Sequence, residues 1–74
     1  MQSIEIELGL KFLPQIVQIL KALGAVYPQM NYIWVADKPR DSFRLSVKCS
    51  DPMFFWEFGK FSGRMLELDE LENG

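Results

Sequence analysis

The chain has 74 residues, of which 49% are apolar and 14% aromatic, and its formal net charge is −2. This size and composition indicate one folded domain, residues 1–74, and exclude a disordered chain. The negative charge argues against nucleic acid and against an anionic membrane surface as partners, and it favours a basic partner.

The first segment with a clear period is Ser3–Leu8, in which apolar and polar residues alternate. This alternation predicts a half-buried strand. The helix predicted next, Leu13–Gly24, has an apolar stripe at Leu13, Ile16, Val17, Leu20 and Leu23. Pro14 suits its first turn, and Gly24 suits the left-handed position just past its end.

Two further strands are predicted to form an antiparallel hairpin. Met30–Asp37 is rich in aromatic and β-branched residues, and Ser42–Ser50 alternates strictly. The polar turn Asp37–Asp41 joins them. In the first of these strands we expect Ile33 and Val35 on the core face and Tyr32 and Trp34 on the other. In the second, we expect Phe43, Leu45, Val47 and Cys49 on the core face, and Ser42, Arg44, Ser46 and Lys48 opposite.

A second helix is predicted to start at Asp51 and Pro52, because aspartate caps helices and proline fits the first position. We expect it to end at Ser62 and Gly63. The following segment, Arg64–Leu71, fits either a strand or a helix, and the alternation of its leucines with acidic residues favours a fourth strand. The phenylalanines expected on the core side of the helix are Phe54, Phe55, Phe58 and Phe61, with Trp56 nearly opposite.

The resulting order is βαββαβ, the ferredoxin-like arrangement, in which two helices cover one face of a four-stranded antiparallel sheet. The alternative is βαββαα with a three-stranded sheet. In the first arrangement the closing strand lies beside the first, the first beside the third, and the third beside the second. The aliphatic faces of the strands would then form the core with the helices: Ile4, Ile6, Leu8, Ile33, Val35, Phe43, Leu45, Val47, Leu66 and Leu68.

The open face of that sheet is the expected interaction surface, because its residues are not needed by the core. Aromatic side chains beside an arginine are typical of protein contacts. The alternative is that Glu5 and Glu7 simply pair with Arg44 and Lys48 across neighbouring strands. With a second patch on the non-core flank of the last helix, the predicted partner-binding residues are Tyr32, Trp34, Arg44, Lys48, Met53 and Trp56.

The residues that usually carry catalysis or bind cofactors are missing. The chain has no histidine, and its one cysteine, Cys49, is expected in the core. It has no phosphate-binding glycine loop and no cluster at metal spacing, so we expect no enzyme, no cofactor and no metal. The lone cysteine, the absence of a leader pattern and the lack of a run near the ~20 apolar residues that cross a bilayer favour a cytoplasmic location and no membrane.

The run LPQIVQILKALGAVYP, followed by a hairpin, a second helix and the closing LELDEL, resembles the small ACT regulatory domain over most of the chain. The resemblance implies side-by-side pairing of two copies and an amino-acid effector at their interface. Where that family has an Asp-x-x-Gly type of turn, this chain has Leu8, Gly9, Leu10 and Lys11. We therefore expect a small interaction or regulatory module that binds another protein and forms a homodimer, with a small-molecule effector domain as the alternative and nucleic-acid binding third.

Overall fold

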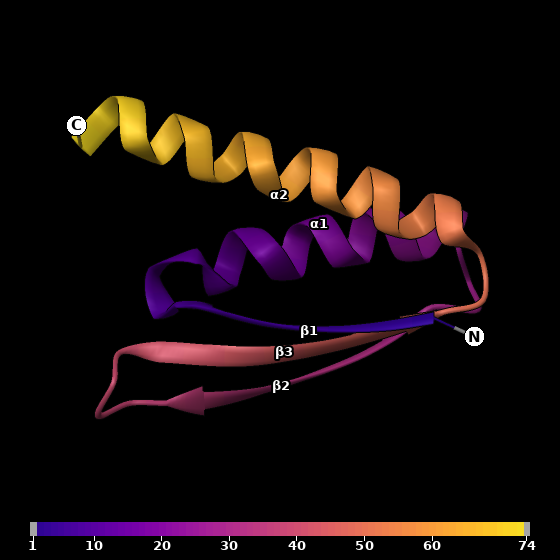
Figure 1. Cartoon of the computed structure of the whole chain (residues 1–74), viewed down its shortest axis with the longest axis horizontal. Helices are drawn as coiled ribbons and strands as arrows, with labels where there is room; N and C mark the ends of the chain where they lie inside the picture. Colours follow the sequence, from indigo (N-terminus) through magenta and orange to yellow (C-terminus); the bar gives the residue numbers. More distant parts are fainter. Residues whose placement is uncertain (1, 74) are drawn as a thin grey trace.

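The fold has two layers: a three-stranded sheet, and a pair of amphipathic helices that covers one of its faces (Figure 1). The structure is a computed structural model that describes residues 2–73. Its elements are β1 (Gln2–Gly9), a short 3-10 helix (Leu10–Phe12), α1 (Leu13–Val26), β2 (Asn31–Asp37), β3 (Ser42–Cys49) and α2 (Pro52–Asn73).

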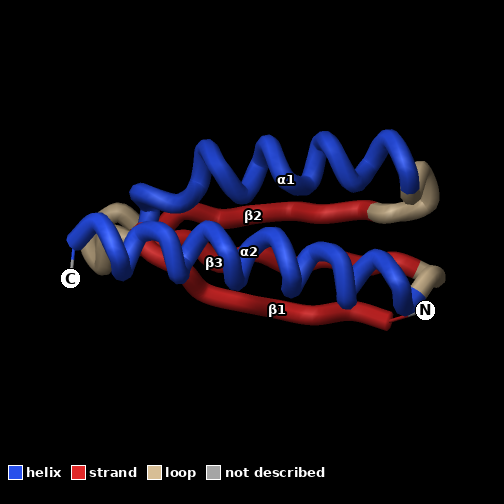
Figure 2. The backbone as a smooth tube through the Cα atoms, turned by 90° about the horizontal axis from the view of Figure 1, so that it is seen from above, coloured by secondary structure: helices blue, strands red, loops and turns tan. Residues whose placement is uncertain are grey.

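The central strand of the sheet is β3, with β1 and β2 antiparallel on its two sides. These neighbours are the ones that the ferredoxin-like order predicts for the same strands. Viewed from above, α1 lies on the β2 side of the helix layer and α2 on the β1 side (Figure 2). Both edges of the sheet are therefore strands with one unpaired side.

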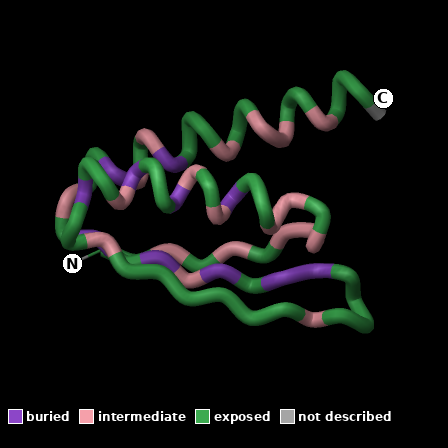
Figure 3. The backbone as a smooth tube through the Cα atoms, turned by 180° about the vertical axis from the view of Figure 1, so that it is seen from behind, coloured by how far each residue is buried: buried purple, intermediate pink, exposed green. Residues whose placement is uncertain are grey.

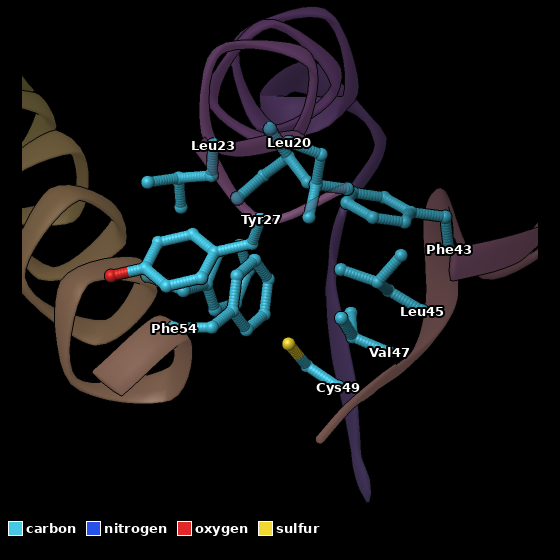
Figure 4. Close-up of a cluster of buried hydrophobic side chains, with 10 residues drawn as sticks. Leu20, Leu23, Tyr27, Phe43, Leu45, Val47, Cys49 and Phe54 are labelled. Carbon is cyan, nitrogen blue, oxygen red and sulfur yellow. The ribbon is translucent and has the colours of Figure 1, made fainter. Parts of the chain in front are cut away.

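The core lies between β3 and the helices, and its central part was predicted from alternation. Phe43, Leu45, Val47 and Cys49 are all 0% exposed, because every second residue of β3 faces the helices. From the helix layer, Ile16, Leu20, Leu23, Phe54 and Phe58 complete the core. Figure 4 shows these side chains converging from β3 and both helices.

The predicted fourth strand is wrong, because Arg64–Leu71 continues the second helix without a break. The three-stranded alternative describes the sheet better. Leucine and glutamate are strong helix formers, and a glycine inside a helix costs only about 1 kcal/mol relative to alanine. The expected stop at Ser62 and Gly63 does not occur: the Ser62 hydroxyl donates a hydrogen bond to the carbonyl of Phe58 at 2.7 Å, within the helix. Leu68 is consequently 53% exposed instead of buried in the sheet.

The first helix also extends further than predicted, through Val26. Gly24 does not adopt the left-handed conformation expected of it, since no glycine of the described chain has a positive φ. The backbone N–H of Tyr27 instead bonds the carbonyl of Leu23 at 2.8 Å. Tyr27, the residue after α1, is a core residue at 8% exposure, and its ring meets Phe54 edge-to-face.

Candidate protein-interaction surface

The strand β2 is the least covered part of the sheet. All residues from Asn31 to Ala36 are exposed, whereas β3 beside it alternates between buried and exposed (Figure 3). Ile33 and Val35 are 66% and 65% exposed. An edge strand carries a row of backbone N–H and C=O groups without a strand partner, so β2 offers both free backbone groups and apolar side chains.

The faces of β2 are the reverse of those predicted. Tyr32 lies opposite Val47, and Trp34 lies opposite Leu45. Because directly opposed residues of an antiparallel pair share a face, Tyr32 and Trp34 lie on the helix side. Ile33 and Val35 lie on the open side. The two aromatic residues are still 36% and 42% exposed, because β2 is at the edge of the layer.

The opposite edge of the sheet, β1, has charged side chains where β2 has apolar ones. Its open face presents Glu5 and Glu7, and each carboxylate lies near an arginine. The Nε atom of Arg44 is 3.6 Å from Glu5, and a guanidinium nitrogen of Arg40 is 3.5 Å from Glu7. The predicted pairing across neighbouring strands is thus confirmed for Glu5 and Arg44. These pairs are exposed, so each contributes at most about 1 kcal/mol.

Of the remaining predicted site residues, Lys48 lies on the open face opposite Ser3 and Asn31. A separate apolar patch at the start of α2 contains Met53 and Trp56, which are 54% and 64% exposed. The ammonium group of Lys60 lies 5.4 Å from the centre of the Trp56 ring. The six predicted residues therefore fall on three surfaces: the helix side of β2, the open face of β3 and the outer side of α2.

The sequence did not predict a groove between α1 and α2, the helix groove, which has a volume of about 690 Å³. The signal was present in the spacing of Phe61, Met65 and Leu68, at i, i+4 and i+7. It was hidden because Arg64–Leu71 was interpreted as a strand. The apolar residues that line the groove are Ile19, Ala22, Leu23 and Val26 from α1, and Phe61, Met65 and Leu68 from α2.

One polar contact joins the two helices beside this groove. The hydroxyl of Tyr27 donates a hydrogen bond to the Glu57 carboxylate at 2.5 Å. That hydrogen bond, followed by desolvation and the negative charge of Glu57, raises the pKa of Tyr27 from 10.0 to about 12. Because the folded pKa lies above the unfolded one, the contact stabilises the fold fully below about pH 10 and loses its effect as pH rises to about 12.

This shift gives a direct titration test. In a Tyr32→Phe variant, where Tyr27 is the remaining tyrosine, phenolate absorbance should rise with a midpoint near pH 12 instead of 10.0. Adding Glu57→Gln should move that midpoint down, because the charged acceptor is gone. Circular dichroism over the same pH range shows whether the chain is still folded. A midpoint at 10.0 in the folded Tyr32→Phe variant would contradict the contact.

Within residues 2–73, no group of three or more histidine, cysteine, aspartate or glutamate side chains is placed to hold a metal ion. Cys49, the only cysteine, is 0% exposed. In the same range, no helix combines the length and apolar character required to span a bilayer. The described surface presents a free strand edge, an apolar groove and charged side chains at its rim.

Comparison with known proteins gives no relative of this chain. No family model matches it, and neither the curated proteins nor the solved structures contain a significant match.

Proposed function

We propose that this chain is a non-enzymatic protein-interaction module that self-associates through the edge of β2. The observation that carries the proposal is the uncovered edge strand Asn31–Asp37, which has no charged residue before its last position. Proteins normally protect such edges with charges, prolines or bulges. An edge without that protection suits addition of another strand, which supplies backbone hydrogen bonds along its length.

A second copy of the chain fits this edge because β2 is complementary to itself. In an antiparallel pair centred on Trp34, the middle residue of the strand, Ile33 lies opposite Val35 of the second copy. Tyr32 then lies opposite Ala36, and Asn31 opposite Asp37. Apolar residues meet apolar ones, and no two like charges are opposed, so each cross-strand pair is neutral or favourable.

The other edge does not have this complementarity. The two-fold pairs that overlap the most of β1 are centred on Glu5 or on Ile6. The first places Glu5 opposite Glu5 of the second copy, and the second places Glu5 opposite Glu7 of the second copy. Like charges directly opposite one another destabilise a sheet. Self-association through β2 is therefore favoured over self-association through β1.

The test uses like charges at two open-face positions of β2. In a variant with Ile33→Lys and Val35→Lys, each lysine of one copy faces a lysine of the other, and apolar contact area is lost. The dissociation constant of the two-copy complex, measured by sedimentation equilibrium, should rise by roughly tenfold or more, which corresponds to about 1.4 kcal/mol. Both positions are solvent-exposed in the single chain, so folding should be retained, which circular dichroism verifies.

A complementary variant makes the test specific. The chain with Ile33→Glu and Val35→Glu should also fail to self-associate, but a mixture of the two variants should form a heterodimer, because lysine then faces glutamate. Met53→Lys, a matched change in the patch on α2, should leave association unchanged. A native chain that stays monomeric at high concentration, or variants that associate as well as the native chain, would sink the proposal.

A further inference from the structure

The helix groove is a second surface, independent of the β2 edge, whose chemistry points to a different occupant. We propose that it binds one helix of a partner protein, an amphipathic helix whose apolar stripe is flanked by lysines or arginines. Three features of the groove favour such a helix: its apolar lining, the charge of its rim and the backbone of its walls.

The lining is apolar and open to solvent. Val26 on α1 is 66% exposed, and Phe61 and Leu68 on α2 are 45% and 53% exposed. These residues face one another across a hollow of about 690 Å³. The buried part of α2 ends at Phe58, and beyond it the helix rises away from the sheet (Figures 1 and 3). Large apolar side chains are thus left without cover on both sides of one depression, as expected of a binding groove.

The walls indicate a helical occupant. Both walls are α-helices, so their backbone N–H and C=O groups already bond within each helix. A strand laid in the groove would find no backbone partners along it, and its own polar groups would be buried unpaired. A helix satisfies its own backbone and presents a row of apolar side chains at i, i+3, i+4 and i+7, which is the usual way that a groove of this kind is filled.

The rim indicates a basic occupant. Glu57, Asp69 and Glu72 border the groove together with one arginine, Arg64. The Asp69 carboxylate is paired with Lys11 at 3.0 Å, so Glu57 and Glu72 are the acidic groups that outnumber the basic one. The last part of α2 is more acidic still: residues 67–72 contain four carboxylates and no basic residue. Negative charges at the C-terminal end of a helix also interact unfavourably with the negative end of the helix dipole. Lysine or arginine side chains of a partner beside this end would offset both the repulsion among the carboxylates and the unfavourable interaction with the dipole.

The same charges argue against a second copy in the groove. The exposed apolar residues of α2 lie among its own carboxylates, so a second α2 placed there would set acidic residues against acidic residues. The two proposed surfaces therefore take different partners: another copy at the β2 edge and a basic helix in the groove.

The probe for the test is a synthetic amidated peptide of about 16 residues, roughly 24 Å of helix. It carries leucines and alanines in a stripe at i, i+3, i+4 and i+7 and lysines elsewhere. A matched peptide has glutamate in place of each lysine. Titration calorimetry at about 0.15 M salt, where exposed charges are screened beyond ~8 Å, measures binding of each peptide to the whole chain. The lysine peptide should bind and the glutamate peptide should not.

Two matched variants locate the site. Leu68→Lys places a charge in the groove and should weaken binding of the lysine peptide roughly tenfold. Leu71→Lys makes the same change on the same helix, at a residue that is 75% exposed and does not line the groove, and should have little effect. Methyl signals of Ala22 and Val26 should shift on titration. Equal effects of both lysine variants, or equal binding of both peptides, would overturn the inference.

This outcome is separable from the proposed self-association. The variant with Ile33→Lys and Val35→Lys should bind the lysine peptide as the native chain does, because its changes lie on the open face of the sheet. Leu68→Lys should self-associate normally. Failure of one surface therefore leaves the other measurable.

Discussion

Replacing Phe54 by alanine should remove about 3–5 kcal/mol from the free energy of unfolding. The side chain is 0% exposed and lies at the centre of the aromatic cluster. Its ring is 5.7 Å from Tyr27 and 5.1 Å from Phe55, both edge-to-face, and 5.9 Å from Phe58, stacked. Truncation would leave a cavity bounded by three rings that cannot all collapse into it. A domain of this size has only about 4–11 kcal/mol in total, so the loss is a large fraction of its stability.

Urea denaturation followed by circular dichroism measures this loss. Phe61→Ala is the matched control, the same change about two turns further along α2 at a side chain that is 45% exposed. It should cost less, because close to half of the residue stays in water after folding. Protein concentration must be held constant, since self-association would add to the apparent stability. Equal losses in the two variants would mean that Phe54 is not in the core.

Replacing both Gly59 and Gly63 by alanine should stabilise the chain by about 2 kcal/mol, roughly 1 kcal/mol for each position inside a helix. An added Cβ at either position meets no atom within 4 Å, so no steric penalty opposes the gain. Alanine also restricts the unfolded chain more than glycine does. The prediction depends on α2 being continuous across residues 59–63.

Thermal and urea denaturation of the two single variants and the double variant check this result. Gly24→Ala is the comparison, because its Cβ would lie 3.4 Å from the terminal carbon of Met30. There the gain should be smaller. No gain at Gly63, with a gain at Gly59, would show that the helix ends where the sequence suggested.

The sequence predicted α1 and the core face of β3 because each has one unambiguous period, and it predicted the hairpin because a polar turn separates two strand-forming segments. It failed at Arg64–Leu71, where Leu66 and Leu68 alternate with acidic residues while Met65, Leu68 and Leu71 fit a helix equally well. Helix propensity summed over a long segment decides that these residues form a helix. A pattern of two-residue alternation does not detect that propensity.

The faces of β2 could not be read from its residues. Tyr32, Ile33, Trp34 and Val35 are all apolar enough for a core, and the edge position leaves both sides half in water. The choice is made by register against β3, which is a tertiary property. The apolar stripe of Phe61, Met65 and Leu68 could be read from its spacing, but the shape of the helix groove could not, because it depends on the angle at which α1 and α2 cross and no local pattern specifies that angle.

The contrast between the two edges of the sheet has a consequence for the size of the assembly. Joining two copies at β2 pairs the exposed β2 edge of each copy with the other. The combined sheet then ends at a β1 strand on both sides. If two copies pair in the proposed way, the glutamates on those β1 strands disfavour a third copy, so growth would end at a closed pair instead of continuing as an open-ended fibre. The carboxylates of β1 contribute little to the stability of one molecule, but they would thus limit the assembly to two copies.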